Sequence, residues 1–121
     1  MIYTSYFAKV NKLPENARCI SICLSPPKGY NGLEYKALAP TWDILKKYKM
    51  NMDQDEYAAA FRAMLSRLNP REVLKDFYSM LNYEDRDMIL LCYEKPPDFC
   101  HRHLVAEWFT NNGYPVEEYQ F

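Results

Sequence analysis

Apolar and polar residues alternate or run together in several segments that have strand character. Residues 2–8 and 18–24 are rich in β-branched and aromatic side chains and end at turn formers, so each predicts a strand. Residues 87–94 contain the run Met88–Cys92, which is apolar on both faces, as in a buried parallel strand. Residues 116–121 are predicted to form a closing strand.

The segments between these strands carry the apolar spacing of helices. Asp53 followed by Glu56 is a variant of the capping box, and Asn69 followed by Pro70 marks a second helix start. Helices are therefore predicted at residues 42–49, from 53 to 68 and from 69 to 81, and a last one starts after Pro96-Pro97-Asp98 and runs to about Asn112, with Gly113 as its cap.

Strands that alternate with helices, with few hairpin signals, predict an α/β fold. We expect a largely parallel central sheet of about four strands flanked by helices, with Rossmann-like layering. The length of 121 residues suits one ordinary domain, so residues 1–121 are expected to form a single α/β domain.

Composition excludes several classes of protein. With 49% hydrophobic residues and a net charge of -1, the chain is not disordered, collagen-like or a coiled coil. The near-neutral charge disfavours non-specific nucleic-acid binding and leaves only a local basic patch open. No apolar run approaches the roughly 20 residues that a bilayer requires, and the first residues lack a signal-peptide pattern. A cytoplasmic protein without membrane contact is expected.

The cysteines are expected to be thiols. Without a secretion signal, disulfides are disfavoured in a reducing compartment. A metal is also not expected, because no Cys-x-x-Cys pair is present and His101 and His103 point to opposite sides of the predicted helix. No other cofactor is predicted. The four cysteines are Cys19, Cys23, Cys92 and Cys100.

The densest polar cluster lies where the buried strand passes into the last helix. Cys100, His101 and Arg102 crowd the first helical turn, where cations are disfavoured unless an anion compensates them. The helical wheel places His101 at the centre of the buried face, and Glu94 ends the strand within reach of His101 or Arg102. Ligands of open α/β sheets bind beyond the carboxyl ends of the strands, where the loop of residues 23–32 also belongs.

Three chemistries compete for this cluster. One is a metal site, for which Cys92, Cys100, His101 and His103 supply suitable atoms at an unfavourable spacing. In an anion or nucleotide site, Arg102 and the free helix amides would hold a phosphate or carboxylate, with Lys28 and the backbone of residues 29–32 closing over it. In a thiol site, the helix N-terminus and His101 would lower the pKa of Cys100 and make it a nucleophile.

A structural interpretation competes with these chemistries. In it, His101 is hydrogen-bonded to a loop carbonyl, Arg102 pairs with Glu94, and the cysteines are core residues. Two interpretations are also open for Tyr30, which either stacks on a nucleobase or packs on the sheet.

The run Leu90-Leu91-Cys92-Tyr93-Glu94-Lys95-Pro96-Pro97-Asp98-Phe99-Cys100-His101-Arg102 and its continuation to Glu107 resembles the domain of unknown function 488 family. That family has an apolar strand ending in Leu-Cys-x-Glu, followed by Cys-His-Arg at a helix start. Residues 19–27 resemble its second segment more loosely, because an Asp and an Arg usual there are replaced by small or apolar residues. The resemblance implies a compact α/β fold and no established reaction. It singles out the motif positions Cys92, Glu94, Cys100, His101 and Arg102.

The leading hypothesis is a protein that binds a small anionic or nucleotide-like ligand at the junction of residues 94–102, with catalysis left open. The alternative is a non-catalytic protein-interaction module in which the same cluster is a structural network. The candidate catalytic residues are Cys100 as nucleophile, His101 as acid or base, and Glu94, which positions them; the candidate ligand-binding residues are Arg102, Ser25, Lys28, Gly29 and Tyr30.

Overall fold

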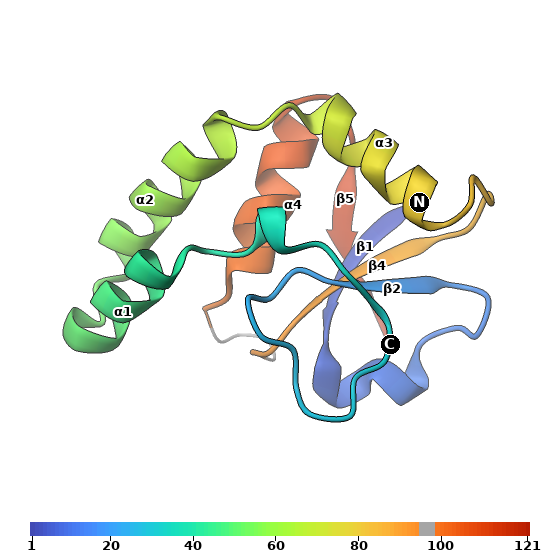
Figure 1. Ribbon diagram of the computed structural model, residues 1–121, viewed down its shortest axis with the longest axis horizontal. Coiled ribbons are helices and arrows are strands. Elements are labelled where there is room, and N and C mark those ends of the chain that lie inside the picture. Colours follow the sequence, from blue (N-terminus) through green and yellow to red (C-terminus); the bar gives the residue numbers. More distant parts are fainter. Residues whose placement is uncertain (95–98) are drawn as a thin grey trace.

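A parallel β-sheet with the strand order β3-β2-β4-β1-β5 forms the centre of the protein (Figure 1). The computed structural model describes residues 1–94 and 99–121. Within these residues the strands are β1 (Ile2–Tyr6), β2 (Arg18–Ser21), β3 (Leu33–Glu34), β4 (Met88–Cys92) and β5 (Val116–Glu118), the α-helices are α1 (Trp42–Asn51), α2 (Gln54–Ser66), α3 (Pro70–Met80) and α4 (His101–Asn111), and two 3-10 helices are η1 (Phe7–Lys12) and η2 (Lys36–Leu38).

The predicted α/β class and parallel sheet are confirmed, with five strands in place of about four. The additional strand is β3, which has only two residues and directly follows the loop expected at residues 23–32. All four predicted strands are shorter than expected; for example, β1 gives way to η1 at Phe7 and β2 ends at Ser21.

Side chains cap the helices α2 and α3 at the predicted positions. The Asp53 carboxylate accepts a hydrogen bond from the Glu56 amide at 3.0 Å, and the Asn69 side chain accepts one from the Arg71 amide at 2.9 Å. Gly113 follows α4 with φ at 90°, the left-handed conformation predicted for this cap. The residues 96–98 that signal the start of the last helix lie outside the described residues, and α4 begins at His101.

The two faces of the sheet are covered differently. Alternation along β4 sends Met88 and Leu90 into the main core under the α-helices, and Ile89 and Leu91 into a smaller core beneath η1. Figure 1 shows the α-helices gathered on the first of these faces. This division follows from the right-handed crossovers between parallel strands. The connections β1 to β2 and β2 to β3 run toward the β3 edge of the sheet, whereas β3 to β4 and β4 to β5 run toward the β5 edge. Right-handed crossovers in opposite directions must lie on opposite faces. None of the helices in the described residues is long and apolar enough to cross a membrane.

Candidate functional site

A cavity of about 250 Å³ lies at the carboxyl ends of β2 and β4. The chain leaves these neighbouring strands toward opposite faces of the sheet, which is the topological switch point where open α/β sheets bind ligands. Residues 23–25 after β2, residues 93 and 94 after β4, and the start of α4 form one wall. The hydroxyl of Tyr93 donates a hydrogen bond to the Ser25 carbonyl and so joins the two strand ends.

Helices α1 and α2 supply the other wall of the cavity, which is rich in aromatic side chains. Trp42, Tyr48 and Tyr57 line it together with Lys49. The Trp42 side chain is 60% exposed and lies beneath the Lys49 ammonium, which is 5.4 Å from the ring centre. A short helix that packs mainly on α2 leaves its first turn over the cavity instead of over the sheet.

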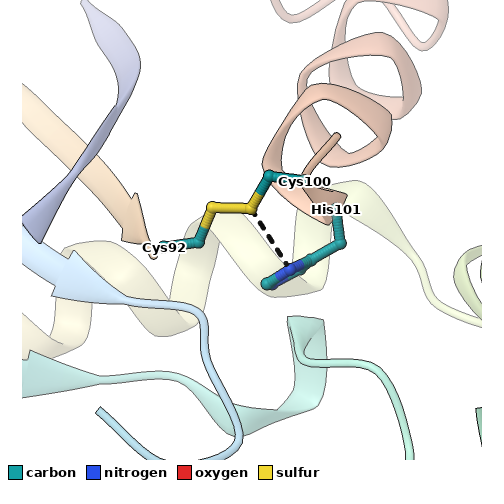
Figure 2. Close-up of side chains that lie close together, drawn as sticks. All are labelled: Cys92, Cys100 and His101. Atoms are coloured by element: carbon teal, nitrogen blue, oxygen red, sulfur yellow. Dashed lines mark hydrogen bonds between the residues drawn. A yellow bond between two sulfur atoms is a disulfide. The ribbon is translucent and has the colours of Figure 1, made fainter. Parts of the chain in front are cut away.

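A disulfide joins Cys92, the last residue of β4, to Cys100, the N-cap of α4 (Figure 2). The expectation that all cysteines are thiols is therefore wrong for this pair. That expectation rested on the compartment, whereas the fold places the end of β4 beside the start of α4. Cys19 and Cys23 are free.

His101 is buried, as the helical wheel predicted, and is hydrogen-bonded to a loop carbonyl. Its Nε2 lies 2.6 Å from the carbonyl oxygen of Ile22. Because a carbonyl only accepts hydrogen bonds, Nε2 carries the proton and Nδ1 presents a lone pair, 3.8 Å from the Cys100 sulfur. Burial lowers the pKa of His101 to about 4, so the ring is neutral at pH 7.

Arg102 is fully buried and is satisfied by protein groups. It forms a bidentate pair with Glu118, with Nε and one terminal nitrogen each 2.9 Å from a carboxylate oxygen. The other terminal nitrogen donates to the Glu94 carbonyl and, at 3.1 Å, to the Cys92 sulfur. The predicted ion pair between Arg102 and the Glu94 carboxylate is wrong. The carboxylate beside the guanidinium is that of Glu118 on β5, and Glu94 contributes only its backbone carbonyl.

Cys23 packs against the disulfide in a small cluster of buried cysteines. Burial raises the pKa of its thiol to about 12, and the nearby charge of Glu94 adds to the effect. The thiol also lies 3.8 Å from the Leu91 carbonyl, to which it donates a weak hydrogen bond. Cys23 is therefore a neutral core thiol at pH 7.

The donor atoms of Cys92, Cys100 and His101 lie within 4.8 Å of one another. These are ligand types that zinc prefers, and reduced sulfurs with the free Nδ1 would supply three ligands. In the oxidised state the two sulfurs are bonded to each other, so they cannot serve as thiolate ligands. The expectation that the protein holds no metal stays a prediction.

The candidate ligand-binding residues separate into two groups. Of the described residues around the cavity, Ser25 lines the wall, whereas Lys28, Gly29 and Tyr30 do not. Tyr30 packs on the sheet, where its hydroxyl donates to the carbonyls of Leu33 at 2.7 Å and Cys19 at 3.3 Å. Among the candidate catalytic residues, Glu94, Cys100 and His101 all line the cavity.

Sequence reasoning missed Glu118 and the aromatic wall. Glu118 lies 16 residues from Arg102, on a different element, so no local spacing links the two. Tyr48 and Tyr57 show helical periodicity, which is equally typical of core residues.

Comparison with known families identifies the chain. A family model described as "Active DUF488-N3 subclade", DUF488-N3a, matches residues 3–113. Because this match spans most of the sequence, the chain belongs to the DUF488-N3a family. Neither the curated proteins nor the solved structures gave a match to the chain.

Proposed function

We propose that this DUF488-N3a protein binds a small nucleotide-like ligand in the cavity between β2, β4 and α1. The observation that carries the proposal is the aromatic cavity at the switch point of the sheet. A planar ring placed between Trp42 and Tyr48 would gain stacking contacts like those that bases make on aromatic side chains.

The anionic group of such a ligand has two partners at the cavity. Lys49 lines it, and α4 begins there without a side-chain cap from Cys100. Uncapped amides at a helix N-terminus favour an anion. Arg102, our first candidate for this contact, acts instead as a positioning residue, because Glu118 already neutralises it.

Cys100 is the group that would act on the bound ligand. It lines the cavity, and with the disulfide reduced its thiol would have His101 Nδ1 as a nearby hydrogen-bond acceptor. The description of the family as an active subclade supports a chemical role. We place this activity in the cytoplasm, where a reducing environment would supply the thiol form.

A second candidate function is a non-catalytic interaction module, favoured by the buried Arg102–Glu118 pair and the His101–Ile22 hydrogen bond. Calorimetric titration with adenosine and adenosine monophosphate separates the two. We expect the monophosphate to bind the reduced protein, and Trp42→Ala to weaken both probes at least about tenfold through lost stacking. Lys49→Ala should weaken only the monophosphate.

Tyr78→Ala is the matched control, because Tyr78 is a half-exposed aromatic residue on α3 that does not line the cavity. It should bind both probes as the wild type does. If the folded wild type binds neither probe, or if Trp42→Ala binds them unchanged, the interaction module is the better description.

A further inference from the structure

The two sulfurs of the disulfide have different surroundings. Cys100 lines the cavity, whereas Cys92 is fully buried at the end of β4. Of the two bonded cysteines, only Cys100 is therefore in contact with the cavity, although it is itself buried. Figure 2 shows Cys100 at the start of α4 beside the His101 ring, and Cys92 at the end of β4.

The two sulfurs also differ in their contact with Arg102. One of its terminal nitrogens donates a hydrogen bond to Cys92 Sγ at 3.1 Å, and the guanidinium is held in place by Glu118. A hydrogen-bond donor stabilises a thiolate, and a stabilised thiolate is the better leaving group in disulfide exchange. Cys92 is thus the better leaving group, and Cys100 is the sulfur that a molecule in the cavity would attack.

We propose that the Cys92–Cys100 pair is a redox centre that exchanges with a small thiol in the cavity, with Cys100 as the attacked sulfur and Cys92 as the leaving sulfur. This inference does not depend on a nucleotide-like ligand. It also gives the disulfide a role in a reducing compartment, where disulfides that form are usually catalytic or redox-sensing.

The exchange balances in two steps. The thiolate of a first small thiol bonds to Cys100 Sγ, the Cys92–Cys100 bond breaks, and Cys92 leaves as a thiolate beside Arg102. A second small thiolate then attacks the small-molecule sulfur of the mixed disulfide and releases Cys100 as a thiolate. Two small thiols become one disulfide, and their two electrons reduce the protein. The two protons that the small thiols lose protonate the two cysteines, directly or through solvent.

The cavity selects for a small reductant. Its volume of about 250 Å³ suits a molecule of modest size, and aromatic side chains line it beside Cys100. Cys23 also lines the cavity, but it is a weak internal nucleophile, because the pKa of its thiol is raised to about 12 and the thiol donates to the Leu91 carbonyl.

The experiment uses 2-mercaptoethanol and its disulfide as probes in a protein with Cys19→Ser and Cys23→Ser. In this background, Cys92→Ser leaves Cys100 alone, and Cys100→Ser leaves Cys92 alone. We expect Cys100 to form the mixed disulfide at least about tenfold faster than Cys92, as followed by intact mass. Equal rates, or a faster Cys92, would overturn the assigned direction.

The same background with both Cys92 and Cys100 present tests the redox role itself. Equilibrated with mixtures of 2-mercaptoethanol and its disulfide, it should pass between dithiol and disulfide forms as the ratio changes. A pair that stays oxidised throughout would be a structural disulfide, and one that stays reduced throughout would be no redox centre at all, so either result refutes the proposal. Circular dichroism of each variant confirms that it is folded.

Discussion

Arg102 at the start of α4 and Glu118 at the end of β5 form a bidentate ion pair, with two N–O distances of 2.9 Å. The arginine side chain is fully buried, and the glutamate side chain keeps 20% exposure. Thr4 on β1 also donates to this carboxylate, at 2.7 Å. The compensating anion that a buried cation requires is therefore a residue of the protein.

Removing Glu118 should destabilise the fold. Glu118→Ala leaves Arg102 as a buried, unpaired charge, and breaking such a pair from one side costs about 3 kcal/mol. Urea denaturation should show this loss in the free energy of unfolding. Glu107→Ala, which removes an exposed pair with Arg62, is the control and should cost less than about 1 kcal/mol. Equal losses in the two variants would contradict the structural role of Glu118.

Acid should destabilise the protein through His101. Burial is the main cause that lowers its pKa to about 4, from a usual value near 6.5. Between these values the unfolded chain binds more protons than the folded protein, so this contribution is fully present above pH 6.5 and is lost as the pH falls toward 4.

The loss from His101 should reach about 2 kcal/mol by pH 5. Unfolding free energies measured at pH 7 and pH 5 for the wild type and for His101→Gln provide the test, because the variant lacks the titrating ring. His103→Gln is the control for the partly exposed neighbour, whose pKa burial also lowers. An equal pH dependence in the wild type and His101→Gln would exclude this explanation.

Reduction of the disulfide should lower stability by a moderate amount. The bond closes a loop with a sequence separation of 8, for which the loss of unfolded-state entropy predicts about 2.5 kcal/mol. Dithiothreitol should therefore lower the Tm by roughly 10 °C, and Cys92→Ser should show no further effect of the reductant. Cys19→Ser retains the disulfide and should respond as the wild type does.

Cys23 should resist alkylation in the folded protein. Burial raises the pKa of its thiol to about 12, so the reactive thiolate is scarce at pH 7. Mass spectrometry after brief iodoacetamide treatment should find Cys23 unlabelled until denaturant is added. Labelling of Cys23 in the native protein at the rate of a model thiol would contradict its placement in the core.

The loop that carries Tyr30 should be sensitive at Gly32. A Cβ added to Gly32 would collide with the ring and hydroxyl of Tyr30, whose hydrogen bonds hold the loop to β2 and β3. We expect both Gly32→Ala and Tyr30→Phe to lower the free energy of unfolding by about 1 kcal/mol. Binding of adenosine should be unchanged in Tyr30→Phe, because this hydroxyl lies outside the cavity wall.

Local signals were enough to predict most of the fold. Asp53 and Asn69 mark helix starts by short-range hydrogen bonds, and the apolar run of β4 marks a buried strand, so each can be recognised within a few residues. The strand β3 could not be found in this way, because two residues are too few to show a period.

The candidate site was predictable where its parts adjoin in sequence. Cys92, Cys100 and His101 flank a single strand-to-helix turn, so strand alternation and the helical wheel brought them together. Glu118 and Trp42 come from distant elements, and their positions depend on how β5 and α1 pack. That packing depends on the whole fold, and the spacing of apolar residues along one element does not predict it.

Three consecutive residues connect the start of α4 to three different parts of the sheet. Cys100 is bonded to β4 through Cys92, His101 contacts the carbonyl that follows β2 at Ile22, and Arg102 reaches β5 at Glu118. A substitution at one of these positions should therefore be strongly non-additive with a substitution of its own partner on the sheet. It should be nearly additive with a substitution of a partner of the other two positions. A pairwise mutational scan of this tripeptide would therefore show which strand each of the three residues depends on.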